Sequence, residues 1–495
     1  MNLTTLLLNI GIVSLILSAL IIFGLKKHKE ILMTFLQTFC GVLFLFSGWV
    51  KAVDPLGTGY KMVDYFTEFE STFADTALSF IAPLFPFFSG YSTAFSVVMI
   101  ILEIMLGIML ITGSRSKLVA WLFFGLVAFF TVLTGFTYLT GYVPPGTNFF
   151  EFSNWGPYVK TNMKVTDCGC FGDFIKLEPK TSFFKDVVLL FPAIYFLVRN
   201  RKMHSLFHTG TNFMIETASL VGLLFYCLSN FMWDIPSVDF RPFAKGKDVA
   251  KTKAIEEQAM ADVKITDWRL KNKASGKEIV IANTEYMTNY KNYPKAEWGV
   301  VDQIKTEPAI KSTKISEFEI QDVDDNDITS DFLGEGTQIL IVSYKLYADI
   351  TTEKVMTKDS LYMMDTLYSD DGAMTIDKRF DRVESKEETV PVFNWDKGFK
   401  ADIKKKLLPV IDQLTAKGVP ATWVVGGAGS TEINALARDM NIKDIRMAQA
   451  DDILLKTIVR SNPGVVLWKD GKIVDKWHID KLPTGDAIIQ QYINE

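Results

Sequence analysis

The 495-residue sequence has little cysteine and little histidine, with four residues of each. Four cysteines cannot staple a chain of this length, which excludes a disulfide-stabilised secreted module. The net charge of −5 is small and negative, and it argues against nucleic acid as the main partner. No cysteine follows residue 227. The second half of the chain therefore cannot carry out thiol chemistry by itself.

Charged side chains are scarce in the first half of the chain. Residues 1–240 carry 15 basic and 15 acidic side chains, whereas residues 241–495 carry 37 and 42. Long uncharged stretches in the first half predict about six membrane-spanning helices. We expect them at about 3–25, 31–52, 90–113, 116–141, 183–198 and 212–232. This composition excludes a wholly soluble enzyme.

The distribution of basic residues predicts the orientation of these helices. No basic residue precedes the first stretch and three lysines follow it, which is typical of a retained helix and not of a cleaved signal peptide. Short loops with eight Lys and Arg alternate with long loops that hold six. The short basic loops are 26–30, 114–117 and 199–207, and the long loops are 51–92 and 142–182. We expect the basic loops in the cytoplasm, which places the long loops and everything after residue 232 in the periplasm of a bacterium.

Several predicted spans contain ionisable residues, of which Lys51 and Glu103 are the most informative. Lys51 ends the second span and Glu103 lies inside the third. A charge at membrane depth is costly and normally finds a partner inside the bundle. One interpretation is a Lys51–Glu103 ion pair that joins two helices. The alternatives are a Lys51 that reaches the interface with Glu103 bonded to a hydroxyl, or a role in handling protons or a ligand.

Cys168 and Cys170 lie in the motif Asp-Cys-Gly-Cys-Phe-Gly-Asp on the second long loop. Two cysteines one residue apart can close only a strained ring, and strain makes a disulfide easier to exchange. Gly169 supplies the backbone freedom that the ring needs. Asp167 and Asp173 would tune the local field, and their charges would raise the thiol pKa values. A structural disulfide remains an alternative, and two thiols without a nearby histidine fall short of a zinc site.

The other two cysteines, Cys40 and Cys227, lie within apolar spans. A cysteine in such surroundings usually behaves as a small inert core residue. The sequence leaves open whether either of them meets the loop of Cys168 and Cys170.

Three motifs in this half carry a family resemblance. They are FLFSGWVKAVDP at 44–55, LEIMLGIMLITG at 102–113 and DCGCFGD at 167–173. Together, over about residues 30–200, they resemble the MauE/DoxX family of small four-helix membrane proteins, and more distantly the DsbB and vitamin K epoxide reductase bundles. The resemblance implies periplasmic disulfide chemistry, such as maturation of a disulfide-rich partner in methylamine utilisation, or electron transfer to quinone. The first and sixth spans and the long C-terminal part depart from the family pattern, and a second Cys-x-x-Cys is absent.

The second half is expected to form a stalk (233–250), a polar connector of irregular or small-strand structure (251–315) and an α/β domain (316–495). Strands are predicted at 318–323, 337–343, 421–425, 464–468 and 472–477, and helices at 400–417, 430–440, 452–459 and 484–493. Residues 350–395 are expected to be a charged insertion. A strand–helix–strand–helix order that ends in a hairpin and a helix is typical of an α/β fold.

The end of the chain, SNPGVVLWKDGKIVDKW, resembles the end of the thioredoxin fold. The resemblance implies that Pro463 is cis and faces the former active site. A thioredoxin would carry Cys-x-x-Cys after the central strand, where this chain has Tyr344 to Tyr347. The sequence therefore predicts a degenerate thioredoxin-like domain whose face binds a partner protein.

Two functions fit these observations. The first is a thiol–disulfide oxidoreductase of the bacterial inner membrane, in which Cys168 and Cys170 exchange with a periplasmic or envelope partner. The second is a non-enzymatic scaffold or assembly subunit of an envelope complex, in which the cysteine-free domain is the interaction module. An exposed and reducible Cys168–Cys170 pair would favour the first function, and a buried pair or a large apolar patch on residues 316–495 would favour the second.

Overall fold

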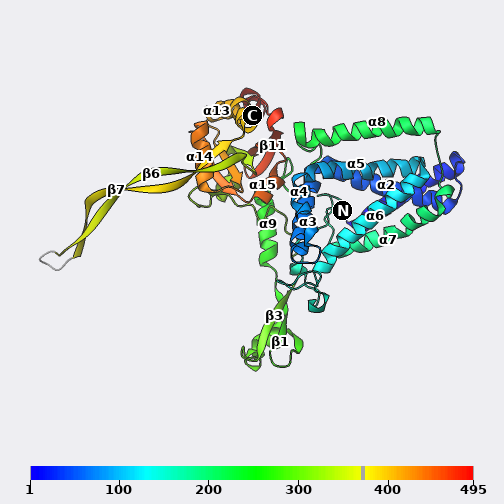
Figure 1. Ribbon diagram of the computed structural model, residues 1–495, viewed down its shortest axis with the longest axis horizontal. Helices are drawn as coiled ribbons and strands as arrows, with labels where there is room; N and C mark the ends of the chain where they lie inside the picture. The colour runs from blue at the N-terminus through cyan, green and yellow to red at the C-terminus, as the bar shows by residue number, and fades with distance from the viewer. Residues whose placement is uncertain (1, 369–373, 494–495) are drawn as a thin grey trace. The chain divides into compact units, whose positions relative to one another are not determined.

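A computed structural model describes residues 2–368 and 374–493 (Figure 1). The backbone divides into two compact units. Unit 1 contains Met1–Lys247, Thr457–Ser461 and Lys476–Lys481, and unit 2 contains Asp248–Lys456, Asn462–Asp475 and Leu482–Glu495.

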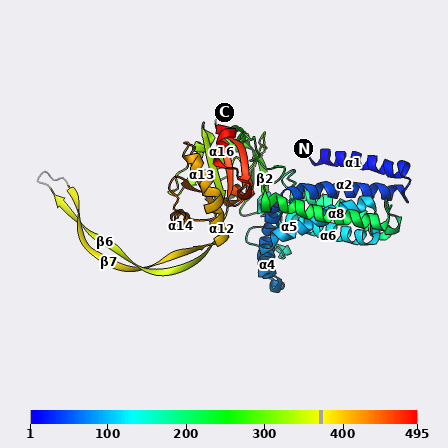
Figure 2. The same ribbon diagram turned by 90° about the horizontal axis from the view of Figure 1, so that it is seen from above.

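Unit 1 is helical, and six of its described helices are long and apolar enough to cross a membrane. They are α1 (Leu3–Ala19), α2 (Ile31–Val53), α5 (Ser92–Thr112), α6 (Ser116–Thr140), α7 (Pro179–Arg199) and α8 (Thr209–Leu228). Short turns extend α1, α7 and α8 to Gly24, Lys202 and Trp233. Helix α1 lies along α2 at the side of the bundle (Figure 2). The six predicted spans are thereby confirmed as helices of spanning length.

The fifth span is longer than predicted. It was expected at 183–198, but α7 begins at Pro179, which occupies its first turn. A proline fits this position because it has no N–H to leave unbonded. Lys185 and Asp186, which lie inside the expected span, pair with each other at 2.8 Å.

The long loop 51–92 is also mostly helical, as α3 (Pro55–Ala74), a short turn (Ser79–Ile81) and α4 (Leu84–Gly90). Asp54 caps α3 by accepting the N–H of Gly57 at 3.1 Å, a common way to satisfy the first free amides of a helix. Phenylalanine rings join α3 to its neighbours. Helix α3 is the element that reaches the cysteine motif.

The helices of unit 1 approach closely where glycine allows it. A Cβ at Gly107 of α5 would lie 2.8 Å from the carbonyl oxygen of Gly41 in α2, and one at Gly48 would lie 2.4 Å from Ile104 Cγ1. Small residues are a usual means of close helix packing in membranes. The core that surrounds these contacts includes Leu43, Phe44, Leu106, Leu110, Phe123 and Phe196.

Unit 2 begins with a helix that the polar connector pattern did not predict. Helix α9 (Val249–Ala261) starts at Asp248, whose carboxylate accepts the N–H of Lys251 at 2.9 Å. A small antiparallel sheet follows, in which β1 (Ile265–Asn272) lies between β2 (Glu278–Ala282) and β3 (Trp298–Lys305). Short helices in this unit include α10 (Asn283–Asn289) and α11 (Thr329–Leu333).

A six-stranded mixed sheet forms the core of the α/β region. Its order is β11 (Lys472–His478), β10 (Gly464–Lys469), β5 (Thr337–Ser343), β8 (Ala421–Gly426), β9 (Arg446–Ala450) and β4 (Gln321–Asp322). Strands β5, β8 and β9 are parallel, while β10 and β4 are antiparallel to their neighbours. Four predicted strands are confirmed. The strand predicted at 318–323 shrinks to two residues, and β9 was not predicted.

The helices predicted around this sheet are present. They are α12 (Lys397–Asp402) and α13 (Leu408–Thr415), joined by a π turn, α14 (Ser430–Met440), α15 (Asp452–Ile458) and α16 (Gly485–Ile488). The structure thus joins a helical region suited to a membrane with an α/β, sheet-rich C-terminal region.

The charged insertion forms a long antiparallel ribbon of β6 (Ala348–Tyr368) and β7 (Met374–Trp395), which extends away from the rest of unit 2 (Figures 1 and 2). The structure does not describe the side chains of the last residue pairs of the ribbon before its turn. Apolar side chains on the ribbon are exposed, including Ile350, Met356, Met364, Phe380 and Val383.

Candidate functional site

The motif with Cys168 and Cys170 lies on the loop between α6 and α7. Gly169 and Gly172 adopt positive φ angles of 59° and 50°, a conformation that favours glycine. Gly169 therefore occupies a backbone position at which glycine is favoured. Phe171 is 1% exposed and pairs with Ile175 in an isolated bridge. Its burial anchors the loop in the bundle core.

Both thiols are free, and the protein surrounds them differently. Cys168 is 9% exposed, and Cys170 is partly exposed. The Cys170 thiol lies 3.7 Å from Ser182 Oγ, and Ser47 Oγ donates to the Cys170 carbonyl at 2.8 Å. These contacts hold the motif against α2 and α7.

Basic side chains neutralise the two carboxylates of the motif. Asp167 lies 3.3 Å from Lys61, and Asp173 lies 3.5 Å from Lys176 and 3.8 Å from Arg460. Burial alone would lower the pKa of Lys61, but Asp167 and a second carboxylate raise it. The charges that we expected to act on the thiols are thus partly offset by partners.

Burial is the main influence on Cys168. It raises the pKa of this thiol to about 12, with a further contribution from Cys170, while the nearby hydroxyls of Ser182 and Tyr65 act in the opposite direction. A thiol in apolar surroundings stays protonated at neutral pH. Reaction of Cys168 as a thiolate therefore depends on hydrogen-bond donors at its sulfur.

The two intramembrane charges form an ion pair. Lys51 Nζ lies 2.7 Å from Glu103 Oε2, and the two residues are 6% and 3% exposed. Lys51 also lies over the ring of Phe130 at 5.2 Å. The structure therefore agrees with the interpretation in which the pair joins α2 to α5, and Lys51 does not reach water.

A second buried pair connects the bundle to the cysteine motif. Lys185 pairs with Asp186 and lies 5.6 Å from the ring centre of Phe171. Thr134 Oγ1 donates to Asp186 at 3.1 Å. Both Cys170 and Glu103 act electrostatically on Lys185. The Lys185–Asp186 pair thus lies beside Phe171 of the cysteine motif.

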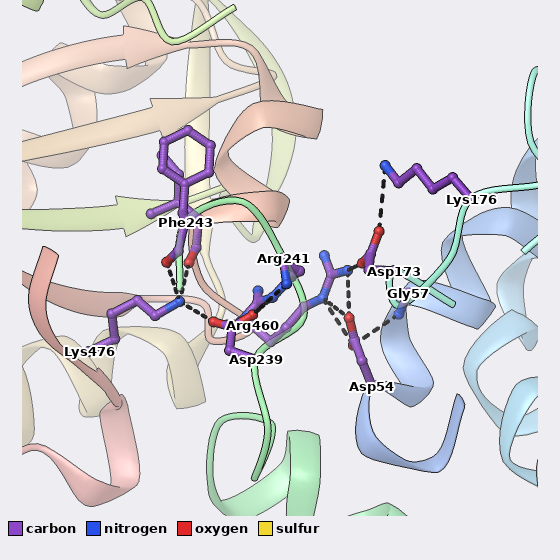
Figure 3. A network of polar contacts seen from close by, with 10 residues as sticks. Asp54, Gly57, Asp173, Lys176, Asp239, Arg241, Phe243, Arg460 and Lys476 are labelled. Atoms are coloured by element: carbon purple, nitrogen blue, oxygen red, sulfur yellow. Dashed lines mark hydrogen bonds and ion pairs between the residues drawn. The ribbon is translucent and has the colours of Figure 1, made fainter. Parts of the chain in front are cut away.

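Arg460 is a site residue that the sequence did not suggest. It contacts Asp54 through Nε and a terminal nitrogen, and it lies beside Asp173 (Figure 3). Its guanidinium also lies 5.1 Å from the ring centre of Tyr60. Burial would raise the pKa of Asp54, but Arg460 and then Arg241 lower it. No local pattern around residue 460 reveals these partners.

A second network in Figure 3 centres on Lys476. The Lys476 ammonium contacts Asp239 and donates to the carbonyls of Phe243 at 2.8 Å and Ile458 at 3.0 Å. Burial and the nearby Arg241 lower its pKa to about 8, although Asp239 acts in the opposite direction. This buried ammonium secures the segment between the last span and unit 2.

The residues of the predicted thioredoxin-like face lie in unit 2. The Asn462–Pro463 bond is cis, as expected. Asn462 Nδ2 donates to the carbonyl of Lys345 at 2.8 Å, which connects the proline loop to the segment from Tyr344 to Tyr347. Tyr347 is 41% exposed and its ring lies 5.5 Å from that of Phe399. Pro463 and the tyrosine segment are therefore brought together, but neither belongs to the same unit as the cysteines.

A metal centre is not formed by the residues that the structure describes, since they contain no group of three His, Cys, Asp or Glu suited to hold an ion. Cys40 and Cys227 are fully buried in apolar clusters.

Comparison with known proteins identifies part of the chain. Residues 29–146 match the family Methylamine utilisation protein MauE. The match covers the two predicted motifs at 44–55 and 102–113, including Lys51 and Glu103, but it ends before Cys168. No curated protein and no solved structure matches the chain. The MauE-like membrane part is thus supported, whereas the cysteine motif and unit 2 lie outside the match.

Proposed function

We propose that the chain is a MauE-type protein of the bacterial inner membrane that exchanges disulfides with a periplasmic or envelope partner protein through Cys168 and Cys170. The observation that carries this proposal is the pair of free thiols on one glycine-containing turn, with Cys170 partly exposed. The predicted orientation of the basic loops supports a periplasmic location for this turn.

The exchange needs no other reactant than the two thiol–disulfide couples. A partner dithiol gives two electrons to the Cys168–Cys170 disulfide, and the partner disulfide and the reduced pair form. The reverse reaction oxidises the pair to a disulfide and reduces the partner disulfide to a dithiol. Which direction dominates depends on the two reduction potentials.

We propose further that unit 2 contains a thioredoxin-like domain without its own thiols. The order β8, β5, β10, β11, with β5 and β8 parallel and β10 antiparallel, supports it. So does the cis proline that precedes β10. Such a domain would recruit the partner protein.

The test of the exchange is the reduction potential of the Cys168–Cys170 pair in the full chain, measured by thiol trapping in glutathione buffers with Cys168→Ser as control. A value near or above about −230 mV is expected for an exchange-competent disulfide. A value below about −300 mV would mark a structural bond and would reject the proposal.

A scaffold function is the second candidate, and the β6–β7 ribbon favours it. A two-stranded ribbon is marginally stable alone, and its exposed apolar side chains, among them Met364 and Phe380, resemble those of interaction surfaces. Deletion of the ribbon would abolish assembly with envelope partners in this case, while Cys168→Ser would leave assembly intact.

A further inference from the structure

In the sequence, Cys168 and Cys170 have nearly symmetrical surroundings, since an aspartate flanks the motif on each side. The structure separates them. Cys168 is buried beneath the loop, whereas Cys170 is partly exposed and lies 3.7 Å from Ser182 Oγ. A partner sulfur must approach along the line of the disulfide and therefore reaches Cys170 more easily.

Helix α3 lies along the loop that carries the buried sulfur. Lys61 pairs with Asp167 at 3.3 Å, and Glu68 pairs with Lys164 at 3.0 Å. Residues four and three positions apart share one face of a helix. Tyr65 lies between these two ion pairs on the same face and is therefore directed toward the segment from Lys164 to Cys168.

The hydroxyl of Tyr65 is buried, and among the described residues it has no hydrogen-bond partner with acceptable geometry. Tyr65 is only 4% exposed. An unbonded buried donor is costly and rare in folded proteins. Its neighbours are Thr137 and Cys168, both close enough to influence its pKa. Thr137 Oγ1 donates its own hydrogen to the Leu133 carbonyl at 3.0 Å, and the Tyr65 hydroxyl acts to lower the pKa of the Cys168 thiol, as a donor to its sulfur does.

We propose that Tyr65 is the hydrogen-bond donor for the Cys168 thiolate, so that Cys170 forms the mixed disulfide and Cys168 is the leaving group. This inference rests on the proposed exchange. A partner thiolate attacks the Cys170 sulfur, and the Cys168–Cys170 bond breaks. The electron pair of that bond goes to Cys168, and the resulting thiolate accepts a hydrogen bond from the Tyr65 hydroxyl. The second thiolate of the partner then attacks the partner sulfur of the mixed disulfide. This step closes the disulfide of the partner and releases Cys170 as a thiolate.

The surroundings of Cys168 explain why such a donor is needed. Burial disfavours its thiolate, and the Asp167 carboxylate adds negative charge nearby, although Lys61 pairs with Asp167. Two side-chain hydroxyls, those of Tyr65 and Ser182, act in the opposite direction and lower the pKa of Cys168. A hydrogen bond from a neutral donor to a buried charge is stronger than one between neutral groups.

The first test compares Tyr65→Phe with Tyr91→Phe in the full-length protein in detergent. Tyr91 is 55% exposed and serves as the matched control. After reduction with dithiothreitol, the alkylation of each cysteine by iodoacetamide is followed by mass spectrometry from pH 7 to 11. We expect Tyr65→Phe to slow alkylation of Cys168 about tenfold at each pH in this range, as a rise of about one unit in the thiol pKa would, with no loss of thermal stability, because the change removes an unbonded buried donor.

A Tyr65→Phe variant that loses stability and keeps the parent pH profile would overturn the inference, because that result is typical of a packing role. The alkylation experiment uses the reduced protein and decides the role of Tyr65 even if glutathione fails to reduce the pair. That failure would instead reject the proposed exchange.

The second test assigns the two sulfurs. Single variants are incubated with oxidised glutathione, and the mixed disulfide on the remaining thiol is quantified. We expect Cys168→Ser to collect glutathione on Cys170 at least ten times faster than Cys170→Ser collects it on Cys168. Equal or reversed rates would overturn the assignment.

Discussion

Arg460 contacts both carboxylate oxygens of Asp54, through Nε at 3.0 and 2.9 Å and through a terminal nitrogen at 2.7 Å. The two residues are 406 positions apart in the sequence, yet both belong to unit 1. Asp54 also caps α3 through Gly57, where a Cβ would lie 3.1 Å from the Arg460 side chain. Arg460 therefore stabilises the start of the helix that carries Tyr65.

Removal of Arg460 should destabilise the protein. Arg460→Met leaves Asp54 as a buried carboxylate without its main partner, and such losses cost about 3 kcal/mol. We expect a lower midpoint of thermal unfolding in detergent. The double variant Arg460→Met with Asp54→Asn should recover part of the loss, because the unpaired charge is gone. An Arg460→Met variant as stable as the parent protein would show that the ion pair contributes nothing.

Stability at acidic pH should depend on Asp239. Burial would raise the pKa of this carboxyl from 3.8, but Arg241 and then Lys476 lower it to about 2. A folded-state pKa below the unfolded value stabilises the protein above pH 3.8, and this contribution is lost as the pH falls from about 4 to 2. The shift corresponds to about 2 kcal/mol.

The free energy of unfolding, measured from pH 2 to pH 6, checks this expectation. Asp239→Asn should lower stability near pH 6 and flatten the acid dependence below pH 4. Asp234→Asn is a suitable control, because Asp234 lies on the same connecting segment and is exposed. An unchanged acid profile in Asp239→Asn would contradict the role given to this carboxylate.

Variants of the buried Lys51–Glu103 pair distinguish a structural role of the pair from a role in handling protons. Glu103→Gln leaves the Lys51 ammonium without its counter-charge, and we expect a loss of about 3 kcal/mol. Glu103→Gln combined with Lys51→Met should be more stable than Glu103→Gln alone.

The reduction potential of the cysteine pair decides between the two roles. If the ion pair only joins α2 to α5, the double variant keeps the parent potential and its pH dependence. A changed pH dependence in a variant that remains folded would show that Glu103 exchanges protons with the dithiol region.

Much of this architecture is predictable because its signals are local. The uncharged stretches identify all six spans, and the apolar run at Thr337–Ser343 and the Asp-Gly turn at 470–471 identify β5 and the final hairpin. The Lys51–Glu103 pair was one of the alternatives, since each charge at membrane depth requires a partner. These features depend on chemistry within one element or between adjacent helices.

The residues that surround the thiols were not predictable in the same way. Loop 51–92 contains too many polar residues to signal a buried helix, so α3 and the face with Lys61 and Tyr65 were missed. Arg460 finds Asp54 only through the tertiary fold. Helix α9 was missed because few of its side chains are buried. Tertiary contacts, and not periodicity, determine these elements.

The thioredoxin-like interpretation of unit 2 predicts that a redox site can be restored. Tyr344→Cys with Tyr347→Cys creates a Cys-x-x-Cys spacing directly after β5, next to the loop of Pro463. We expect the two new thiols to form a disulfide that reduced glutathione can open. In this chain β6 begins at Ala348 where a thioredoxin would continue into a helix, so no helix N-terminus stabilises the new thiolate.

The restored disulfide should for that reason be a weak oxidant, with a potential closer to the value of about −270 mV for thioredoxin than to about −120 mV for DsbA. The protein used for this measurement also carries Cys168→Ser and Cys170→Ser, so that the measured potential is that of the new pair. Tyr344→Cys with Tyr347→Ser provides the single-thiol control. Two thiols that oxidised glutathione modifies separately, without forming a bond to each other, would show that the Tyr344–Tyr347 segment does not have the geometry of a thioredoxin active site.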